Sequence, residues 1–355
     1  MPAILVTGGT GLVGSAVLDA LEGACVISLT RHGASGWSAD AAREGRSASA
    51  LLPTGNGHIV GAYDAGHVEH VRGDVTRPRL GLSESQHEQL AECVDVVIHA
   101  AGVTDYTTPR ATTEALNVTG TRNVARFAER AQAPLYHVST GYVRAQGTSV
   151  RGRFGAQVYL DSKREAERVV GECATLAAIV RPSVVFGHSR DGSSASFQGL
   201  HQLVRLVLEN DLPLLPFPEE TRVDFLPRDV VGRVIAELAT EGFQGEFWLT
   251  AGAGAPTFGH VVELLVGFAA DRGRRLDRPR FVSREMIDRL LKPVGGPALA
   301  RRVDLLLALT SHLQADPLPS SLGPEDRAEL DQVLVRGAGF WAQRSGWATK
   351  DPVPT

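Results

Sequence analysis

Cysteine, continuous positive charge and long apolar runs are all scarce in this chain of 355 residues. The three cysteines, Cys25, Cys93 and Cys173, are odd in number and far apart. This argues against a disulfide framework or a cysteine-based metal site, and it predicts reduced thiols. The formal net charge is −4, and the densest basic cluster, residues 272–280, is short and broken by Pro279. Because nucleic-acid binding needs a continuous positive surface, we expect no nucleic-acid partner.

The chain also lacks an apolar run of membrane-spanning length. A strand-like run begins at Ala3, which leaves no room for a secretion signal, and no Cys/His spacing is typical of a metal site. We therefore expect a soluble cytoplasmic protein without a resident metal. With 43% hydrophobic residues, the chain is long enough for one large α/β domain and a smaller lobe.

The most informative segment lies at the N-terminus. The apolar run 3–7 leads into Gly8, Gly11 and Gly14, and a helical pattern follows over 15–21. A buried strand, a glycine turn and a helix N-terminus let the backbone approach a pyrophosphate. The alternative is an ordinary strand-to-helix turn, but this placement favours dinucleotide binding. The predicted contacts are Gly8, Thr10, Gly11, Leu12, Val13 and Gly14.

A second predicted strand, 24–29, ends at Thr30, Arg31 and His32. At this point an NAD site usually carries a carboxylate for the ribose 2′-hydroxyl, whereas an arginine pairs with a 2′-phosphate. Arg31 therefore predicts NADPH, and the alternative is a solvated loop charge. Residues 33–66 are rich in Gly, Ser and Ala, and we expect irregular structure there.

Further strands alternate with helical patterns, as in a doubly wound parallel sheet of the Rossmann type. The third and fourth strands are predicted over 68–71 and 94–99, a helix over 112–131, and the fifth strand over 135–138. Asp74 is suited to accept from the adenine amino group, although Asp at a strand end is as often a cap. The residues that follow these strands are Gly73, Asp74 and Val75, then Ala100, Ala101 and Gly102, then Ser139 and Thr140.

Tyr159 and Lys163 stand four residues apart in a segment that favours helix, so both side chains share one face. A nearby ammonium stabilises the phenolate and is expected to lower the pKa of Tyr159. The pair therefore indicates a general acid, Tyr159, whose pKa is adjusted by the neighbouring ammonium of Lys163. The alternative for Lys163 is a solvated helix residue.

These motifs, in this order, resemble the extended short-chain dehydrogenase/reductases. The ordered set is Gly8/Gly11/Gly14, Asp74, His99–Gly102, Asn117–Thr121 (NVTGT), Val138–Thr140, Tyr159-x-x-x-Lys163 and Arg181–Pro182. Finer details over roughly residues 1–250 are similar to the thioester reductase and fatty acyl-CoA reductase branch, namely GDVTRPRLGL, RPSVVFGHSRDG and VDFLPRDVV.

The resemblance implies roles for these residues. Tyr159 would protonate the carbonyl oxygen as hydride arrives from NADPH, Lys163 would hold the nicotinamide ribose, and Thr140 would donate to the same oxygen. Asn117 would organise a proton-relay water, or it is merely a capping amide; Thr140 could likewise be a plain strand end. The cofactor contacts implied further along are Ala100, Ala101, Gly102, Tyr159, Lys163, Pro182, Val184 and Val185.

In the thioester reductases the substrate is an acyl group on coenzyme A or on the phosphopantetheine arm of an acyl carrier protein. The product is an aldehyde, or an alcohol in some members. A stand-alone ketone or aldehyde reductase would fit the same residues, and a nucleotide-sugar epimerase or dehydratase is a further alternative, which Arg31 disfavours. A non-catalytic redox sensor or scaffold is disfavoured by the retention of Thr140, Tyr159 and Lys163.

Residues 1–185 are expected to form the dinucleotide-binding domain, and residues 186–355 a mainly helical substrate lobe interleaved with it. Helices are predicted over 197–210, 228–239, 258–270, 284–291 and 298–309, and a short strand over 223–225. Trp341 and Trp347 are expected to pack the tail onto this lobe. Neither the substrate nor the oligomeric state follows from the sequence.

Overall fold

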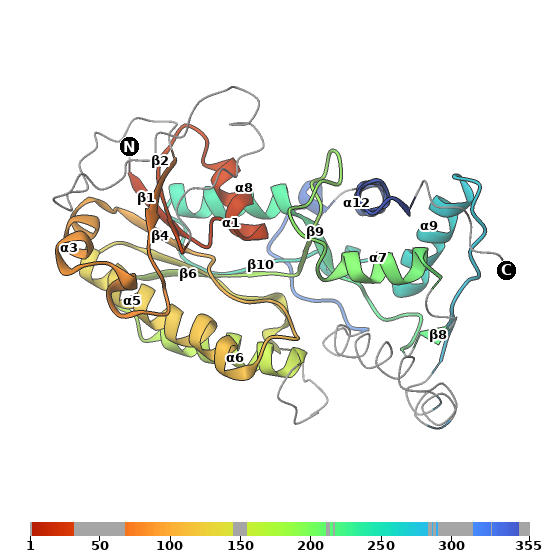
Figure 1. Cartoon of the computed structure of the whole chain (residues 1–355), viewed down its shortest axis with the longest axis horizontal. Coiled ribbons are helices and arrows are strands. Elements are labelled where there is room, and N and C mark those ends of the chain that lie inside the picture. The colour runs from red at the N-terminus through yellow and green to blue at the C-terminus, as the bar shows by residue number, and fades with distance from the viewer. Residues whose placement is uncertain are drawn as a thin grey trace.

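A seven-stranded parallel sheet forms the centre of the molecule (Figure 1). The computed structural model describes residues 2–31, 68–144, 155–210, 214–215, 217–282, 286, 289, 315–327 and 329–347. In the strand order β10-β6-β5-β4-β1-β2-β3, the chain adds strands on one side of β1 up to β3 and then on its other side from β4 to β10. This switch between β1 and β4 confirms the predicted doubly wound fold. The strands are β1 Ala3–Thr7, β2 Cys25–Thr30, β3 Val68–Arg72, β4 Val96–His99, β5 Leu135–Val138, β6 Leu176–Pro182 and β10 Gly245–Leu249.

Helices cover both faces of the sheet, which explains why its central strands are buried along their whole length and mainly apolar (Figure 1). On one face lie α1 Leu12–Ala20 and α8 Arg228–Thr240, and on the other lie α3 Glu84–Cys93, α5 Gly120–Ala131 and α6 Ala156–Gly171. A Cβ at Gly232 of α8 would lie 2.3 Å from the carbonyl oxygen of Ala16. Glycine therefore allows α8, which comes late in the chain, to pack directly on α1.

The smaller lobe contains helices α7 Leu200–Leu208, α9 Phe258–Ala270 and α12 Leu330–Arg344. Two short parallel pairs accompany them: β7 Val184–Phe186 with β9 Phe225–Pro227, and β8 Leu214–Leu215 with β11 Arg280–Phe281. Trp341 is buried, and Trp347 Nε1 donates to the Leu208 carbonyl at 2.8 Å. The expected packing of the tail onto this lobe is thus confirmed.

Several element boundaries differ from those predicted. The single helix expected over 112–131 is divided into α4 Arg110–Glu114, a π-helical turn Ala115–Thr119 and α5. Helix α7 begins three residues later than expected because Gly199, at φ +54°, turns the chain before it. The strand expected over 223–225 begins instead at Phe225. The helices predicted over 284–291 and 298–309 and the irregular stretch 33–66 lie outside the described residues, apart from isolated positions.

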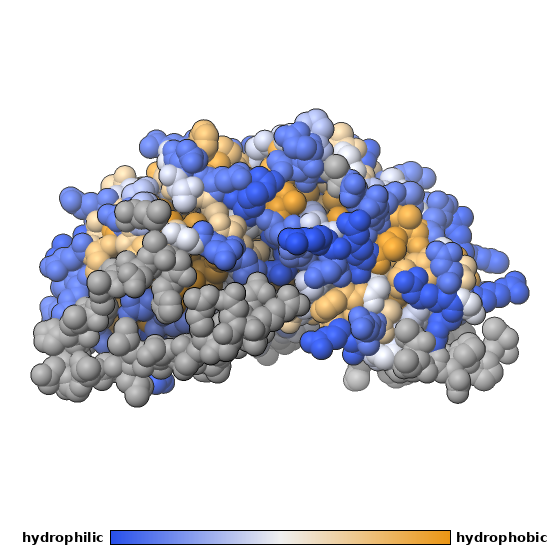
Figure 2. Space-filling view, turned by 90° about the horizontal axis from the view of Figure 1, so that it is seen from above, coloured by the Kyte–Doolittle hydropathy of each residue, from blue (hydrophilic) through white to orange (hydrophobic). Residues whose placement is uncertain are grey.

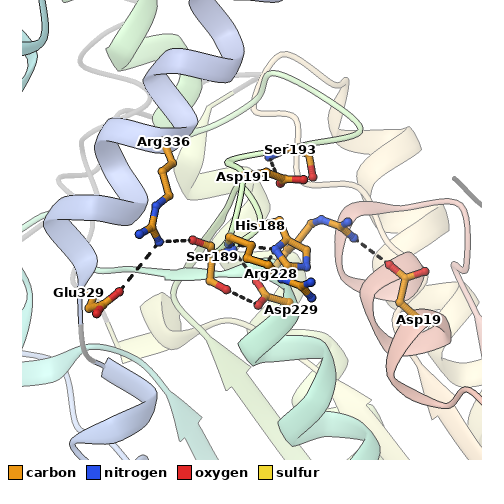
Figure 3. Close-up of polar contacts among 10 residues, drawn as sticks. Asp19, His188, Ser189, Asp191, Ser193, Arg228, Asp229, Glu329 and Arg336 are labelled. Atoms are coloured by element: carbon orange, nitrogen blue, oxygen red, sulfur yellow. Dashed lines mark hydrogen bonds and ion pairs between the residues drawn. The ribbon is translucent and has the colours of Figure 1, made fainter. Parts of the chain in front are cut away.

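Polar contacts brace the turn after β7 against both parts of the molecule (Figure 3). Ser189 Oγ donates to Asp229 of α8 at 2.6 Å, and Arg336 of α12 donates to the Ser189 carbonyl at 2.6 Å. Beside them, Arg228 pairs with Asp19 of α1 at 3.0 Å. The turn therefore links the lobe helix α12 to the sheet helix α8, and Arg228 of α8 in turn holds α1.

The described surface is mixed in character. Hydrophilic and hydrophobic residues alternate over the face in Figure 2, and the only large, strongly exposed hydrophobic side chains among described residues are Phe243 and Met286. None of the described helices combines the length and apolarity needed to cross a bilayer.

Candidate functional site

The glycine turn after β1 lies at the point where the strand order reverses. Gly8 has φ +79°, and a Cβ there would lie 2.6 Å from the Ala101 amide nitrogen at the end of β4. A Cβ at Gly14 would lie 2.1 Å from the Gly8 carbonyl oxygen. These positions admit only glycine, because the β1 turn, α1 and the end of β4 meet backbone to backbone. Crevices of this kind, at the carboxyl ends of the strands, are where open α/β sheets bind ligands.

Helix α1 directs its N-terminus into this crevice. Gly11 is its N-cap and donates its N–H to the Gly8 carbonyl at 2.9 Å. Thr10 is exposed, and Leu12 and Val13 are half-buried. The amides of the first helical turn and the helix dipole favour an anion at this point, so the turn fits a pyrophosphate.

Arg31 and Asp74 lie at the ends of β2 and β3. Arg31 is exposed, whereas Asp74 accepts hydrogen bonds from the Thr76 amide (2.9 Å) and hydroxyl (2.7 Å) and lies 3.8 Å from Arg77. Burial raises the pKa of Asp74, but the Thr76 bonds and the charges of Arg31 and Arg77 together bring it below its ordinary value. Asp74 thus caps this turn through Thr76, and its adenine-binding role stays a prediction.

The next residue, Val75, is buried, with its side chain directed at Gly120 of α5. Its carbonyl accepts from Asn123 Nδ2 at 2.8 Å. Val75 thus fixes the end of β3 against α5.

Tyr159 lies on α6 beside Thr140 at the end of β5, and both are nearly buried. Burial raises the pKa of Tyr159 to about 12, although a hydrogen bond with Thr140 lowers it in part. The expected net lowering by Lys163 is therefore wrong for this structure, because loss of hydration is the largest influence on this pKa and raises it. The phenol is protonated at neutral pH, the state that a proton donor requires.

Lys163 is buried one helical turn further along and donates to the Val138 carbonyl at 3.0 Å. Burial lowers the pKa of Lys163 to about 8, whereas the charge of Glu167 raises it. Glu167 is held by Arg181 at 2.9 and 2.8 Å and by the Ser139 hydroxyl at 2.5 Å. Its spacing of four residues from Lys163 is a sequence signal that motif matching overlooked.

Asn117 lies in the π-helical turn, and its side chain is fully occupied. Its Oδ1 accepts from the Val103 amide at 2.8 Å, while Nδ2 donates to the Val103 carbonyl at 3.1 Å and to Ser162 Oγ at 2.9 Å. A Cβ at Gly102 would lie 3.0 Å from Asn117 Oδ1 and 3.5 Å from Lys163 Nζ. Asn117 therefore positions the loop after β4, and Gly102 leaves room for the amide and for Lys163.

A buried polar chain, which the motifs did not reveal, supports this arrangement. Thr121 donates to the Asn117 carbonyl at 2.6 Å, so its oxygen accepts from His99 Nε2 at 3.0 Å. Nδ1 of the same ring then accepts from the Thr7 hydroxyl at 2.7 Å. Burial, with the charge of Lys163, lowers the pKa of His99 to about 3, so the ring is neutral. These hydrogen bonds connect β1, β4 and the π-helical turn beneath the crevice.

The remaining candidates follow β6. Pro182 ends that strand, and Val184 and Val185 begin β7 half-buried. Val184 packs against the apolar cluster that contains Tyr159. The structure thus brings together the β1 turn, the end of β4, Thr140, Tyr159, Lys163 and Val184, and it places Arg31 and Asp74 at the ends of the outer strands.

Comparisons with known proteins agree with this geometry. Residues 6–235 match the model of the family described as "Male sterility protein". Glycine betaine reductase ATRR from Emericella nidulans is 30% identical over 190 residues, which are 49% of this chain and 15% of that protein. L-2-aminoadipate reductase from Saccharomyces cerevisiae is 27% identical over 264 residues, which are 65% of this chain and 18% of that protein. The chain thus spans less than a fifth of the length of either relative.

Among solved structures, the terminal R domain from the myxalamid PKS-NRPS biosynthetic pathway has the same fold. It superposes with a TM-score of 0.69 at 22% identity, covering 98% of this chain and 92% of that one. The family match, which extends from β1 into α8, includes the whole crevice. The chain belongs to the male sterility protein family, on the thioester reductase branch of the extended short-chain dehydrogenase/reductases.

Proposed function

We propose that this protein uses NADPH to reduce the carbonyl of an acyl thioester to an aldehyde. The observation that carries the proposal is the buried pair of Tyr159 and Thr140, a protonated phenol with a hydroxyl beside it at the crevice. Such a pair can hold a carbonyl oxygen and supply the proton that it needs when it becomes an alkoxide. Tyr159, Thr140 and Lys163 have these roles in the proposal, and Asn117 positions the loop after β4.

The bound cofactor would supply a hydride. Gly8, Gly11 and Gly14 would admit its pyrophosphate, and Lys163 would hold the nicotinamide ribose. Arg31, exposed at the end of β2, favours NADPH because its guanidinium can pair with a 2′-phosphate. Ala100, Ala101, Gly102, Pro182, Val184 and Val185 would complete the cofactor contacts.

The proton and electron balance of the step is simple. Hydride adds to the thioester carbon, the π electrons move to oxygen, and the Tyr159 proton goes to that oxygen to give a hemithioacetal. Collapse re-forms the carbonyl with loss of the hydroxyl proton, the C–S bond breaks, and the sulfur leaves as a thiolate, which takes a proton from water to give the thiol. Tyr159 can receive the hydroxyl proton in that collapse, so one residue serves both directions of proton transfer.

The named relatives support a thioester as the substrate class. Two are reductases of glycine betaine and of L-2-aminoadipate, and another solved structure of this fold is a thiolation-reductase di-domain from an archaeal non-ribosomal peptide synthetase. We therefore propose a carrier-bound or coenzyme A-bound acyl group as the substrate, with an acyl carrier protein as the partner in the first case.

The test is a substrate panel followed at the nicotinamide absorbance band. Acyl-CoA, acyl-carrier thioesters, the matching free aldehydes and simple ketones are each mixed with the protein and NADPH. The proposal predicts thioester-dependent NADPH oxidation with release of one thiol per turnover. Activity on aldehydes or ketones alone would replace it with the ketone/aldehyde reductase alternative.

Cofactor choice is tested separately with Arg31→Ala. We expect the wild-type protein to bind NADPH more tightly than NADH, and the substitution to weaken NADPH binding by about tenfold or more while leaving NADH unchanged, because only NADPH carries the 2′-phosphate. Asp74→Asn is a control at the neighbouring strand end. A wild-type preference for NADH, or tightly bound NAD in the purified protein, would favour the epimerase or dehydratase alternative.

A further inference from the structure

A C-terminal segment lies along the end of β10, the edge strand of the sheet. Trp248 and Ser321 are paired in both directions, the Ser321 amide to the Trp248 carbonyl at 2.8 Å and the Trp248 amide to Ser321 Oγ at 2.9 Å. Thr250 donates to the Pro319 carbonyl, and Ser320 Oγ donates back to the Thr250 carbonyl at 2.7 Å. Residues 318–322, here called the edge segment, are therefore fixed to the end of β10 and to Thr250 by backbone and side-chain hydrogen bonds.

The edge segment directs Leu318 toward the Tyr159 site. Leu318 is 7% exposed and belongs to one apolar cluster with Tyr142, Tyr159 and Leu160. Its Cδ1 lies 3.4 Å from where a Cβ of Gly141 would be, and Gly141 directly follows Thr140. The side chain thus supports the turn that carries the Thr140 hydroxyl.

A second set of contacts holds the same turn from another side. Tyr142 donates its hydroxyl to the Asp224 carbonyl at 3.0 Å, and the Asp224 carboxylate accepts from the Ala251 and Gly252 amides at 2.8 and 2.9 Å. Gly252, at φ +59°, is so close to the edge segment that a Cβ there would lie 3.0 Å from the Leu318 carbonyl oxygen. The turn after β5, the end of β10 and the edge segment therefore form one packed unit.

We propose that Leu318 is a positioning residue, which acts through the Gly141 turn and the tyrosine cluster to hold the Thr140 hydroxyl against the Tyr159 phenol. The expected effect of Leu318 on turnover rests on the proposed function. Its effect on the positions of Thr140 and Tyr159 does not, because it concerns the protein without substrate. A residue some 160 positions after Tyr159 in the chain thereby helps to place the two hydroxyl groups that would contact the substrate carbonyl oxygen.

The chain offers a matched control in Leu322. This leucine lies on the same edge segment and is 9% exposed, but it packs into the main core cluster and not with Tyr159. Leu318→Ala and Leu322→Ala remove the same atoms at similar burial, and we expect the two substitutions to lower stability to a similar extent. Leu318→Met conserves volume and serves as the rescue variant.

The first readout needs no substrate. Protein labelled with 3-fluorotyrosine gives fluorine resonances for five tyrosines, and Tyr159→Phe identifies the one from Tyr159. We expect Leu318→Ala to shift or broaden that resonance, Leu322→Ala to leave it in place, and Leu318→Met to restore it. An unchanged Tyr159 resonance in folded Leu318→Ala, or equal changes in both alanine variants, would overturn the proposal.

The second readout uses turnover. We expect Leu318→Ala to lower kcat about tenfold or more with little change in NADPH affinity, and Leu322→Ala to leave kcat near wild type. In a Thr140→Val background the Leu318 effect should fall to less than about twofold, because the hydroxyl that it positions is gone. Additive losses in that cycle would contradict the positioning role.

The two readouts also separate the two proposals. If no thioester is reduced by the wild type, the proposed function fails while the fluorine experiment still decides the role of Leu318. If turnover is normal but Leu318→Ala behaves like Leu322→Ala in both readouts, the positioning proposal alone fails.

Discussion

Replacing Gly14 by alanine tests whether the β1 turn is a close-packed nucleotide cradle. The new Cβ would lie 2.1 Å from the Gly8 carbonyl oxygen and 2.6 Å from its carbon, both backbone atoms that cannot swing away. Contacts below 3.0 Å force a rearrangement, so α1 and the turn must separate by about 1 Å. A displacement of that size at a binding site costs about 100-fold, equivalent to about 2.7 kcal/mol.

Gly267→Ala is the matched control. Gly267 also lies inside a helix, α9, but a Cβ there meets no atom within 4 Å. Both substitutions gain about 1 kcal/mol of helix propensity, so any difference between them comes from the steric contact. We expect Gly267→Ala to be neutral or stabilising and to bind NADPH as the wild type does.

The assay is a fluorescence titration with NADPH, accompanied by thermal unfolding of each variant. The predicted result is a Kd raised about 100-fold for Gly14→Ala in protein that is still folded at the assay temperature. If Gly14→Ala bound NADPH with the wild-type Kd, the β1 turn would not be the pyrophosphate site and the argument from its glycines would fail.

Two further predictions concern charge and packing. Because the pKa of Lys163 is lowered to about 8, its ammonium is present below that pH and lost above it, and NADPH affinity should fall above about pH 8. Glu167→Gln removes the charge that raises this pKa and should move the fall to lower pH. Lys163→Arg keeps a positive charge at every pH tested and should abolish the fall. An affinity independent of pH up to 9.5 would contradict this. Gly337→Ala places a Cβ 2.2 Å from the buried Phe186 ring and should cost about 1–3 kcal/mol in urea unfolding, whereas Gly339→Ala, 3.7 Å from its nearest neighbour, should not destabilise.

The sheet could be predicted from sequence because its signals are local. The five strands 3–7, 24–29, 68–71, 94–99 and 135–138 are found within about two residues of their predicted limits. Four of them are mainly apolar runs buried on both faces, whereas the edge strand β3, with the sequence VEHVR, is half-buried or exposed; each ends in small or polar residues. Strands β6 and β10 are not among the predicted strands. Their place in the sheet is set by tertiary pairing of β6 with β5 and of β10 with β6, which the sequence does not display.

The sequence could predict that Thr140, Tyr159 and Lys163 lie near one another, but not their electrostatics. A four-residue spacing places Tyr159 and Lys163 on one helical face, yet it carries no information about hydration. Burial of the phenol raises the pKa of Tyr159, and Lys163 donates a hydrogen bond to the Val138 carbonyl and not to Tyr159. The π-helical turn at Asn117 and the contact from Leu318 are tertiary features without a local signature. The boundary between domains at residue 185 stays a prediction, since α8 and β10 return to the sheet from beyond it.

The most direct test of the central claim is single-turnover reduction of an acyl thioester by Tyr159→Phe. NADPH deuterated at the transferred position is mixed with the variant and with the wild type, and deuterium is followed into the product. The account predicts NADPH binding as in the wild type, deuterium in the wild-type aldehyde, and a loss of at least about 100-fold in rate for the variant, because the proton donor is gone. A Tyr159→Phe protein that reduced the thioester at the wild-type rate would contradict the account.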